Sequence, residues 1–235
     1  MLLTRPIVDV EIATPRARVV HLDMRGTAFR FEPGQAIWLG AHGQDQRKPY
    51  SIASAPEDMD RDGRIELLVG VDASGSPGRH LALQVGTSVD VEGPVGKFTF
   101  PSDPVERRFL FIAGGTGIAP LRSMLRHSVS VPHRAIGLMY SARLPEELAY
   151  AEELRAMATA GTIELRLTVT RDVEHGTWTG ARGRITRQDL APLVHDPSTL
   201  CFVCGPQALV DEMPGLLQSL GVARERVRVE EWGSG

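Results

Sequence analysis

Short runs of alternating apolar and polar residues fill the first part of the chain. Runs such as VDVEIA, RARVVHLDM and RIELLVGV are rich in Val and Ile, and turn-forming clusters such as EDMDRDGR and DASGSPG separate them. Short period-two runs at this spacing are typical of strands in an antiparallel sandwich or barrel. We therefore predict an all-β domain over residues 1–103.

The pattern changes after the charged, proline-containing segment FPSDPVERR. The apolar runs RFLFIA, AIGLMYSA and TLCFVC are continuous, and they alternate with helix-like stretches such as PEELAYAEELRAMA and PQALVDEMPGLLQSL. Continuous apolar strands alternating with helices indicate a parallel sheet buried on its faces. We predict an α/β domain over residues 104–235, with ligands at the carboxyl ends of its strands.

A glycine-rich turn in RFLFIAGGTGIAP carries the strongest local chemistry. A buried strand runs into Gly114–Gly117, and a helix is expected from Ile118, with Pro120 in its first turn. Glycines let the backbone approach a ligand, and a helix N-terminus favours an anion. A tight turn without a ligand is the alternative. The second strand ends in YSAR, so Arg143 stands where an NAD-binding fold usually has an acid, which favours a 2′-phosphate.

Composition and charge narrow the class of partner. The net charge is -3 and the pI about 6.2, so we expect no nucleic-acid partner. No apolar run is long enough for a membrane span and no signal peptide is visible, so a cytoplasmic protein is expected. The two cysteines, Cys201 and Cys204, are too few for a four-cysteine iron–sulfur cluster, and we expect no metal site. A thioredoxin-like pair is the minor alternative for them.

Several motifs then follow one another in a familiar order. They are FEPGQ (31–35), RKPYSIAS (47–54), GSPGRHL (75–81), EGPVGKF (92–98), GGTGIAP (114–120), VCGP (203–206) and VEEW (229–232). This ordered set resembles the ferredoxin–NADP⁺ reductase superfamily over nearly the whole chain. The resemblance implies an antiparallel Greek-key β-barrel that binds FAD, followed by a Rossmann-like α/β domain that binds NAD(P).

The resemblance assigns the flavin to the first domain. Tyr50 would pack on the isoalloxazine and Ser51 would lie near its reactive nitrogen. The family has an Arg two residues before the Tyr and a Gly-x-x-Ser at the start of a short helix; here Lys48 and Gly78 stand instead. The residues expected to contact FAD are Arg47, Lys48, Pro49, Tyr50, Ser51, Val69, Gly75, Gly78 and Arg79.

The resemblance likewise assigns the nicotinamide dinucleotide to the second domain. Arg143, Arg171 and Arg184 would hold a 2′-phosphate, although they could also form a solvated charged face. Ser51, Cys204, Glu230 and Trp232 are the expected catalytic residues, with Trp232 covering the flavin until the nicotinamide displaces it. The expected dinucleotide contacts are Gly115, Thr116, Gly117, Pro120, Ser141, Arg143, Arg171, Arg184, Cys204, Gly205 and Pro206.

The function implied is a flavoprotein reductase that takes a hydride from NADP(H), with NAD(H) left open. It would bind FAD and pass electrons to a separate ferredoxin, flavodoxin or oxygenase component, as a monomer. The first alternative is a flavin or ferric reductase that uses free flavin as its substrate. The second alternative is a non-catalytic electron-transfer subunit of a larger complex.

Overall fold

The computed structural model describes residues 1–171 and 178–231. The chain divides into two compact units. The barrel unit comprises Met1–Phe100 together with Arg122–His127, and the α/β unit comprises Pro101–Leu121 and the chain from Ser128 onward. Each unit is described by itself below.

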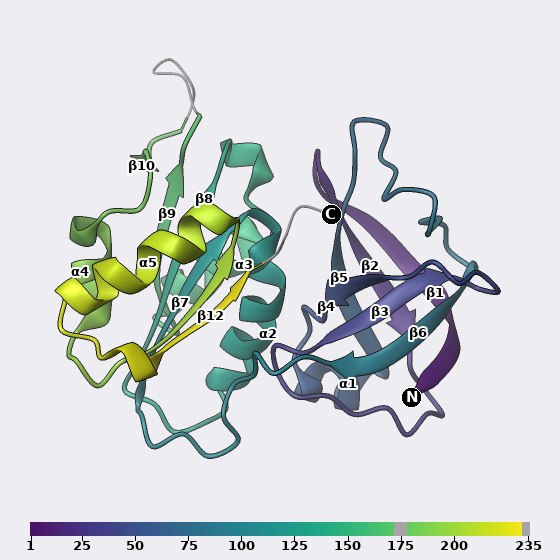
Figure 1. Ribbon diagram of the computed structural model, residues 1–235, viewed down its shortest axis with the longest axis horizontal. Helices are drawn as coiled ribbons and strands as arrows, with labels where there is room; N and C mark the ends of the chain where they lie inside the picture. The colour runs from purple at the N-terminus through teal and green to yellow at the C-terminus, as the bar shows by residue number, and fades with distance from the viewer. Residues whose placement is uncertain (172–177, 232–235) are drawn as a thin grey trace. The chain divides into compact units, whose positions relative to one another are not determined.

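Six antiparallel strands make up the sheet of the barrel unit, in the order β4-β3-β6-β1-β2-β5 (Figure 1). Beyond the two ends of this order, Ile52, directly after β4, bridges to Leu67 of β5, so the sheet closes on itself. The last strand, β6, inserts between β1 and β3, a non-sequential order typical of Greek-key connectivity. The predicted barrel is thus confirmed. The elements are β1 (Leu2–Thr14), β2 (Ala17–Asp23), β3 (Ala36–Ala41), β4 (Lys48–Ser51), α1 (Pro56–Asp62), β5 (Arg64–Gly70) and β6 (Ser88–Val95).

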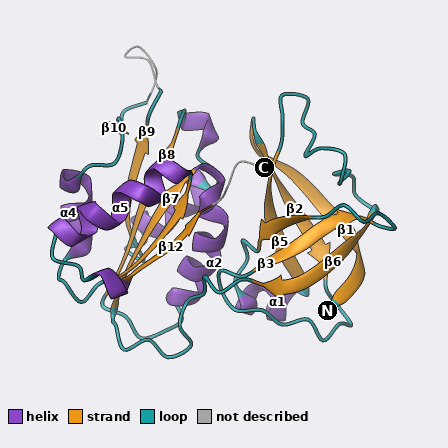
Figure 2. Ribbon diagram, viewed as in Figure 1, coloured by secondary structure: helices purple, strands orange, loops and turns teal. Residues whose placement is uncertain are grey.

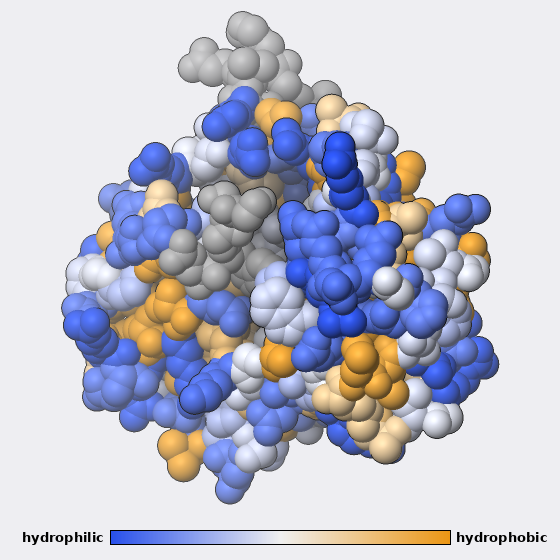
Figure 3. Space-filling model, turned by 45° about the vertical axis from the view of Figure 1, so that its right-hand side comes forward, coloured by the Kyte–Doolittle hydropathy of each residue, from blue (hydrophilic) through white to orange (hydrophobic). Residues whose placement is uncertain are grey.

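Alternating side chains of these strands fill the barrel. Ile65, Leu67 and Val69 of β5 are fully buried and join Val20 and Leu22 of β2 in one core cluster. The period-two pattern of the sequence therefore marks the residues that point inward. The face of the molecule in Figure 3 is mostly hydrophilic, with separate apolar patches.

A parallel six-stranded sheet forms the α/β unit, in the order β10-β9-β8-β7-β11-β12 (Figure 2). Helices α4 and α5 pack on the sheet through a core cluster shared with alternate residues of β7 and β11. The predicted α/β class is confirmed. The elements from residue 101 onward are β7 (Arg108–Gly114), α2 (Ile118–Ser128), β8 (Ala135–Ala142), α3 (Ala151–Thr159), β9 (Glu164–Val169), β10 (Ala181–Arg182), α4 (Arg187–Val194), β11 (Leu200–Gly205), α5 (Gln207–Ser219) and β12 (Val227–Glu231). Residues Arg122–His127 of α2 belong to the barrel unit.

Two segments differ from the sequence-based expectation. The cluster EDMDRDGR, expected as a turn, contains helix α1, which has Pro56 at its start. The carboxylate of Asp58 accepts a hydrogen bond from the N–H of Ala55, which caps this helix. In place of the helix expected from Pro145, Pro145–Glu147 form a 3-10 turn, and α-helix α3 begins at Ala151 after Tyr150, which has a left-handed φ of 61°.

No helix within the described residues is long and apolar enough to cross a membrane.

Candidate functional site

Strand β4 places the RKPYSIAS motif on the barrel. Tyr50 pairs with Ile37 of β3 and is half-buried against the barrel core, while Ser51 pairs with Ala36 and is buried. Pro49, directly before Tyr50, is exposed. Since a half-buried tyrosine offers one ring face to the core and leaves part of itself accessible, Tyr50 is suited to pack against a flat ligand.

The hydroxyl of Ser51 is a buried polar group on β4. Its Oγ atom is buried and has no hydrogen-bond partner among the described residues. Buried hydroxyls in native proteins nearly always have a partner, and an orphaned one calls for a specific explanation. A ligand that accepts or donates a hydrogen bond at this point supplies one, so β4 fits the flavin ring that the sequence resemblance implies.

Two cationic residues, Arg47 and Lys48, precede Tyr50, and their surroundings differ. The guanidinium of Arg47 lies 3.3 Å from a carboxylate oxygen of Glu92 and 3.9 Å from one of Asp90. Arg47 is therefore engaged with carboxylates of its own barrel. Lys48 is half-buried, and its charge adds to burial in lowering the pKa of the His80 imidazole.

The GSPGRHL segment forms turns rather than the short helix expected from the family resemblance. The carboxylate of Asp72 accepts hydrogen bonds from the N–H groups of Ser74 and Ser76 at 2.9 and 3.0 Å, which fixes a tight local turn. Gly75 adopts a φ of +82° that suits glycine. Without the helix, no helix terminus supports a pyrophosphate in this segment.

The other residues expected to contact FAD are Gly78 and Arg79, next to this turn, and Val69, on strand β5. Gly78 and Arg79 are exposed, whereas Val69 is fully buried in the barrel core. The side chain of Val69 is therefore a packing residue, and only its backbone remains for a ligand. Arg18 was not among the candidates, yet its Nη2 atom lies 3.1 Å from the position that a Cβ on Gly75 would take.

In the α/β unit, the glycine-rich turn joins β7 to α2 through a short 3-10 helix, Gly115–Gly117. A Cβ on Gly117 would lie 2.4 Å from the carbonyl oxygen of Cys204, so Gly117 is required for the turn to pack on the end of β11. A Cβ on Gly115 would meet nothing within 4 Å, and Thr116 is exposed. The open side of the turn is therefore at Gly115 and Thr116. Pro120 lies in the first turn of α2, as predicted.

Tyr140 supports this turn and was missed by the sequence analysis. Its ring is fully buried in β8, and its hydroxyl donates to the carbonyl oxygen of Gly115 at 3.1 Å. The same hydroxyl accepts from the N–H of Ala149 at 3.2 Å. A buried tyrosine in a continuous apolar strand gives no sign in the sequence of which backbone group it will hold.

The two cysteines of β11 are both free and fully buried. Side chains three positions apart on a strand point to opposite faces, so Cys201 and Cys204 cannot pair within β11. Burial raises the pKa of Cys201 to about 12. Burial and the charge of Glu230 raise the pKa of Cys204 well above its ordinary value. This contradicts the minor thioredoxin-like alternative, since both sulfurs remain protonated thiols.

Glu230 is aligned with Cys204 in the pairing of β11 with β12. Gly205 follows Cys204 and packs on Gly114, and Pro206 forms the exposed N-cap of α5. The ends of β7, β11 and β12 thus bring the GGTG, VCGP and VEE motifs together in one unit. Trp232 lies outside the described residues.

The candidate arginines follow three neighbouring strands. Arg143 comes after β8, Arg171 after β9 and Arg184 after β10, and the N–H of Arg171 donates to the carbonyl oxygen of Arg143 at 2.8 Å. All three are exposed, and a 3.9 Å ion-pair contact links Arg143 to Glu147. Because the strands are parallel, these cations share the carboxyl edge of the sheet. Ser141 is buried at the end of β8.

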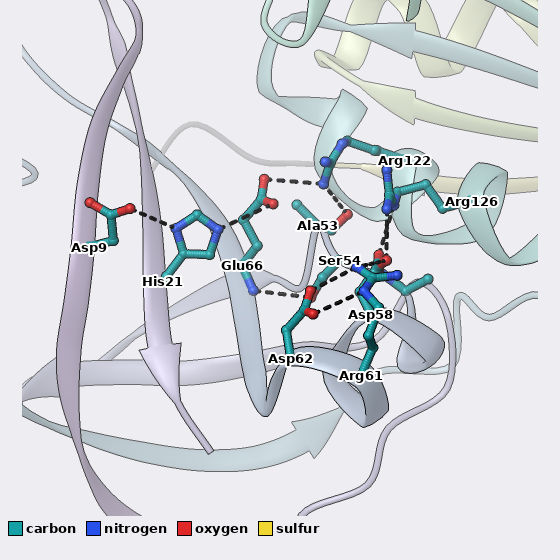
Figure 4. A network of polar contacts seen from close by, with 11 residues as sticks. Asp9, His21, Ala53, Ser54, Asp58, Arg61, Asp62, Glu66, Arg122 and Arg126 are labelled. Atoms are coloured by element: carbon teal, nitrogen blue, oxygen red, sulfur yellow. Dashed lines mark hydrogen bonds and ion pairs between the residues drawn. The ribbon is translucent and has the colours of Figure 1, made fainter. Parts of the chain in front are cut away.

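A polar network holds the segment that follows Ser51 (Figure 4). Within the barrel unit, Arg122 donates to the carbonyl oxygen of Ala53 at 2.9 Å and pairs with Glu66 at 3.1 Å. Arg126 binds both carboxylate oxygens of Asp58 at 2.7 Å. Neither arginine was a candidate, because their partners are far away in the sequence.

Comparison with known proteins agrees with this arrangement. Residues 8–100 match the oxidoreductase FAD-binding domain family, and residues 111–213 match the oxidoreductase NAD-binding domain family. Ferredoxin–NADP reductase B of Sorangium cellulosum is 35% identical over 96% of both chains. Component C of methane monooxygenase from Methylosinus trichosporium is 35% identical over 62% of this chain and 42% of its own.

Solved structures show the same fold. The ferredoxin NADP⁺ reductase of Neisseria gonorrhoeae with bound FAD and NADP superposes with a TM-score of 0.82 over 98% of both chains, at 20% identity. The chain belongs to the ferredoxin–NADP⁺ reductase superfamily. It is an FAD-dependent NAD(P)H oxidoreductase, which passes electrons to a partner.

Proposed function

We propose that the protein is an NADPH-dependent reductase that delivers electrons to a separate ferredoxin-type iron–sulfur protein. FAD, when bound, accepts both electrons of a hydride and can release them one at a time, so it links a two-electron donor to a one-electron acceptor. The residues of the chain would bind and orient the two cofactors.

The choice of NADPH is carried by the exposed arginines at the carboxyl edge of the parallel sheet. Arg143 and Arg171 end neighbouring strands and are joined through their backbones. Guanidinium groups bind phosphate with paired hydrogen bonds, and a cation at this position replaces the acid that would hold the ribose of NAD. Arg184 adds a third cation after the next strand.

On the flavin side, we propose that Tyr50 packs against the isoalloxazine and that the Ser51 hydroxyl hydrogen-bonds a ring nitrogen. The buried, orphaned Oγ atom of Ser51 supports this assignment. Lys48 and Arg79 would contribute charge to the pyrophosphate, with Gly75 and Gly78 giving backbone access. Arg18, beside Gly75, would compensate for Arg47, which is engaged by Glu92 and Asp90.

On the nicotinamide side, we propose that Cys204 acts as a neutral thiol that packs against the ring. Its raised pKa supports a shape-defining role over that of a base or nucleophile. Glu230 would set the local charge.

Two observations support a ferredoxin-type acceptor. Relatives include a ferredoxin–NADP reductase and reductase components of oxygenases, such as that of propane 2-monooxygenase from Rhodococcus jostii, 27% identical over 97% of this chain. The 235 residues contain only two cysteines, both buried in one strand, so they hold no four-cysteine cluster of their own. An iron–sulfur acceptor outside these residues fits both observations.

Donor selectivity tests the proposal directly. We expect the wild-type protein to be reduced faster by NADPH than by NADH under anaerobic conditions. Arg143→Ala should raise the KM for NADPH about tenfold and leave that for NADH nearly unchanged, because a charged hydrogen bond contributes on the order of 1.5–3 kcal/mol. Arg155→Ala, on the exposed face of α3, is the control. Equal KM values for both donors in all three proteins would contradict the assignment.

A free-flavin reductase is the second candidate, and the engagement of Arg47 favours it. An arginine held by Glu92 and Asp90 is less available for a pyrophosphate, and FAD retention would weaken. Gel filtration separates the two functions. Yellow colour that stays with the protein supports bound FAD, whereas colourless protein that oxidises NADPH only with added flavin supports the second candidate.

A further inference from the structure

His80 is a buried histidine to which the sequence motifs assign no role. It follows the Gly75–Arg79 turn and is only 1% exposed, unlike its exposed neighbour Arg79. Its backbone carbonyl accepts a hydrogen bond from the N–H of Ala41 at 2.7 Å, which ties the residue to the end of β3. The backbone hydrogen bond and the surrounding side chains therefore fix the position of the imidazole.

The side chain of His80 meets the candidate flavin-stacking residue. Its Nε2 atom lies 2.7 Å from the hydroxyl of Tyr50. The two ring planes are nearly parallel, at 12°, with centroids 6.0 Å apart. The hydrogen bond joins the edges of the two rings, so the imidazole fixes the orientation of the Tyr50 ring at its far end.

Both partners of this hydrogen bond are neutral near pH 7. Burial, followed by the nearby charge of Lys48, lowers the pKa of His80, so the imidazole is neutral near pH 7. Burial raises the pKa of Tyr50 to about 12, so its phenol keeps its proton. A neutral imidazole has one acceptor nitrogen. With the imidazole proton on Nδ1, the phenol donates to Nε2, and this is the tautomer that the second measurement below tests.

We infer that His80 is a positioning residue that holds the ring of Tyr50 in the orientation needed to stack on the flavin. This inference rests on the proposed role of Tyr50 in FAD binding. A half-buried tyrosine on a four-residue strand would otherwise sample several rotamers, and fixing the ring before the ligand arrives reduces the entropy lost on binding. His80 acts through Tyr50 and needs no contact with the flavin itself.

A double-mutant cycle on FAD affinity tests this role. The proteins are wild type, His80→Phe, Tyr50→Phe and the double variant, each freed of flavin and titrated with FAD by fluorescence quenching. Each single variant should weaken FAD binding about fivefold, as expected for loss of one neutral hydrogen bond. The double variant should bind no more weakly than either single variant, because both changes remove the same contact. His80→Gln, which keeps an acceptor, should bind within about twofold of wild type.

The controls separate this inference from the proposed function. His133→Phe changes an exposed histidine of the α/β unit and should leave FAD affinity unchanged. A wild-type protein that does not bind FAD would overturn the proposed function. A wild type that binds FAD, with His80→Phe binding equally well or with fully additive effects in the cycle, would overturn only the inference.

A second measurement needs no destabilising variant. The ¹⁵N chemical shifts of the His80 ring in the flavin-free wild type report its tautomer, with His80→Gln used for assignment. The inference predicts a neutral ring with its proton on Nδ1 and an Nε2 signal that shifts in Tyr50→Phe. A proton on Nε2, or an Nε2 signal insensitive to Tyr50→Phe, would overturn it.

Discussion

Cys204 and Glu230 lie side by side in the pairing of β11 with β12, and the charge of Glu230 adds to burial in raising the pKa of the Cys204 thiol. The thiol therefore stays protonated at neutral pH. Since thiolates are the reactive form, native protein should react with iodoacetamide far more slowly than a free cysteine. Mass spectrometry should show two alkylated cysteines only after unfolding. Rapid alkylation of Cys204 in the native protein would contradict this account.

The pair formed by Arg122 and Glu66 should contribute strongly to stability. Their side chains are only 8% and 13% exposed, and Arg122 also holds the carbonyl oxygen of Ala53. Removing Arg122 takes a charged donor away from both the Glu66 carboxylate and the carbonyl oxygen of Ala53. We expect Arg122→Ala to lower the free energy of unfolding by about 3 kcal/mol, measured by urea denaturation. Arg155→Ala is the control, and an equally small change in both variants would count against the prediction.

Asp58 should make the barrel unit sensitive to acid. Although burial raises the pKa of Asp58, hydrogen bonds from Arg126, the N–H of Ala55 and Arg61 outweigh it and lower the pKa to about 2. A carboxyl whose folded pKa lies below its unfolded value stabilises the fold above about pH 4, and this contribution disappears as the pH falls toward 2. Urea midpoints of the wild type should therefore fall more steeply than those of Asp58→Asn over this window. Parallel curves for the two proteins would show that Asp58 does not contribute.

Two glycines of the dinucleotide turn should respond differently to the same substitution. In Gly117→Ala the new Cβ would lie 2.4 Å from the carbonyl oxygen of Cys204, so the backbone must shift and stability should fall by about 1–3 kcal/mol. In Gly115→Ala the space is open, and only a φ of +54° causes strain of about 1–2 kcal/mol. The new methyl group of Gly115→Ala would project from the open side of the turn, where the dinucleotide is proposed to bind. The affinity for NADP⁺ should therefore fall in this variant by more than the loss of stability accounts for. Isothermal titration calorimetry and urea denaturation together check both effects, and an identical loss of affinity in both variants would contradict the proposed open side.

The sequence predicted the features that depend on local pattern. Alternation marked the barrel strands, continuous apolar runs marked the parallel strands, and the position of Pro120 in the first turn of α2 followed from its place after the glycines. These features depend on neighbouring residues only, so periodicity and turn chemistry suffice to find them.

Features that depend on distant partners were not predictable in this way. His80 meets Tyr50 across 30 residues, and Arg122 meets Glu66 across 56. The acidic segment that forms helix α1 has a composition typical of a turn. Its helix depends on Asp58, whose carboxylate caps the helix at Ala55 and binds the distant Arg126. The family has a short helix after the glycine at position 75. Here the carboxylate of Asp72 accepts hydrogen bonds from the N–H groups of Ser74 and Ser76, and the segment forms turns.

An anaerobic titration of the purified protein with NADPH and, separately, with NADH tests the central claim most directly. The account predicts a flavin absorption band that remains with the protein through gel filtration and bleaches on addition of NADPH, more slowly with NADH. Bleaching without a preference for NADPH would contradict the role of the exposed arginines. A protein that binds no flavin and oxidises neither donor, even with FAD supplied, would contradict the account as a whole.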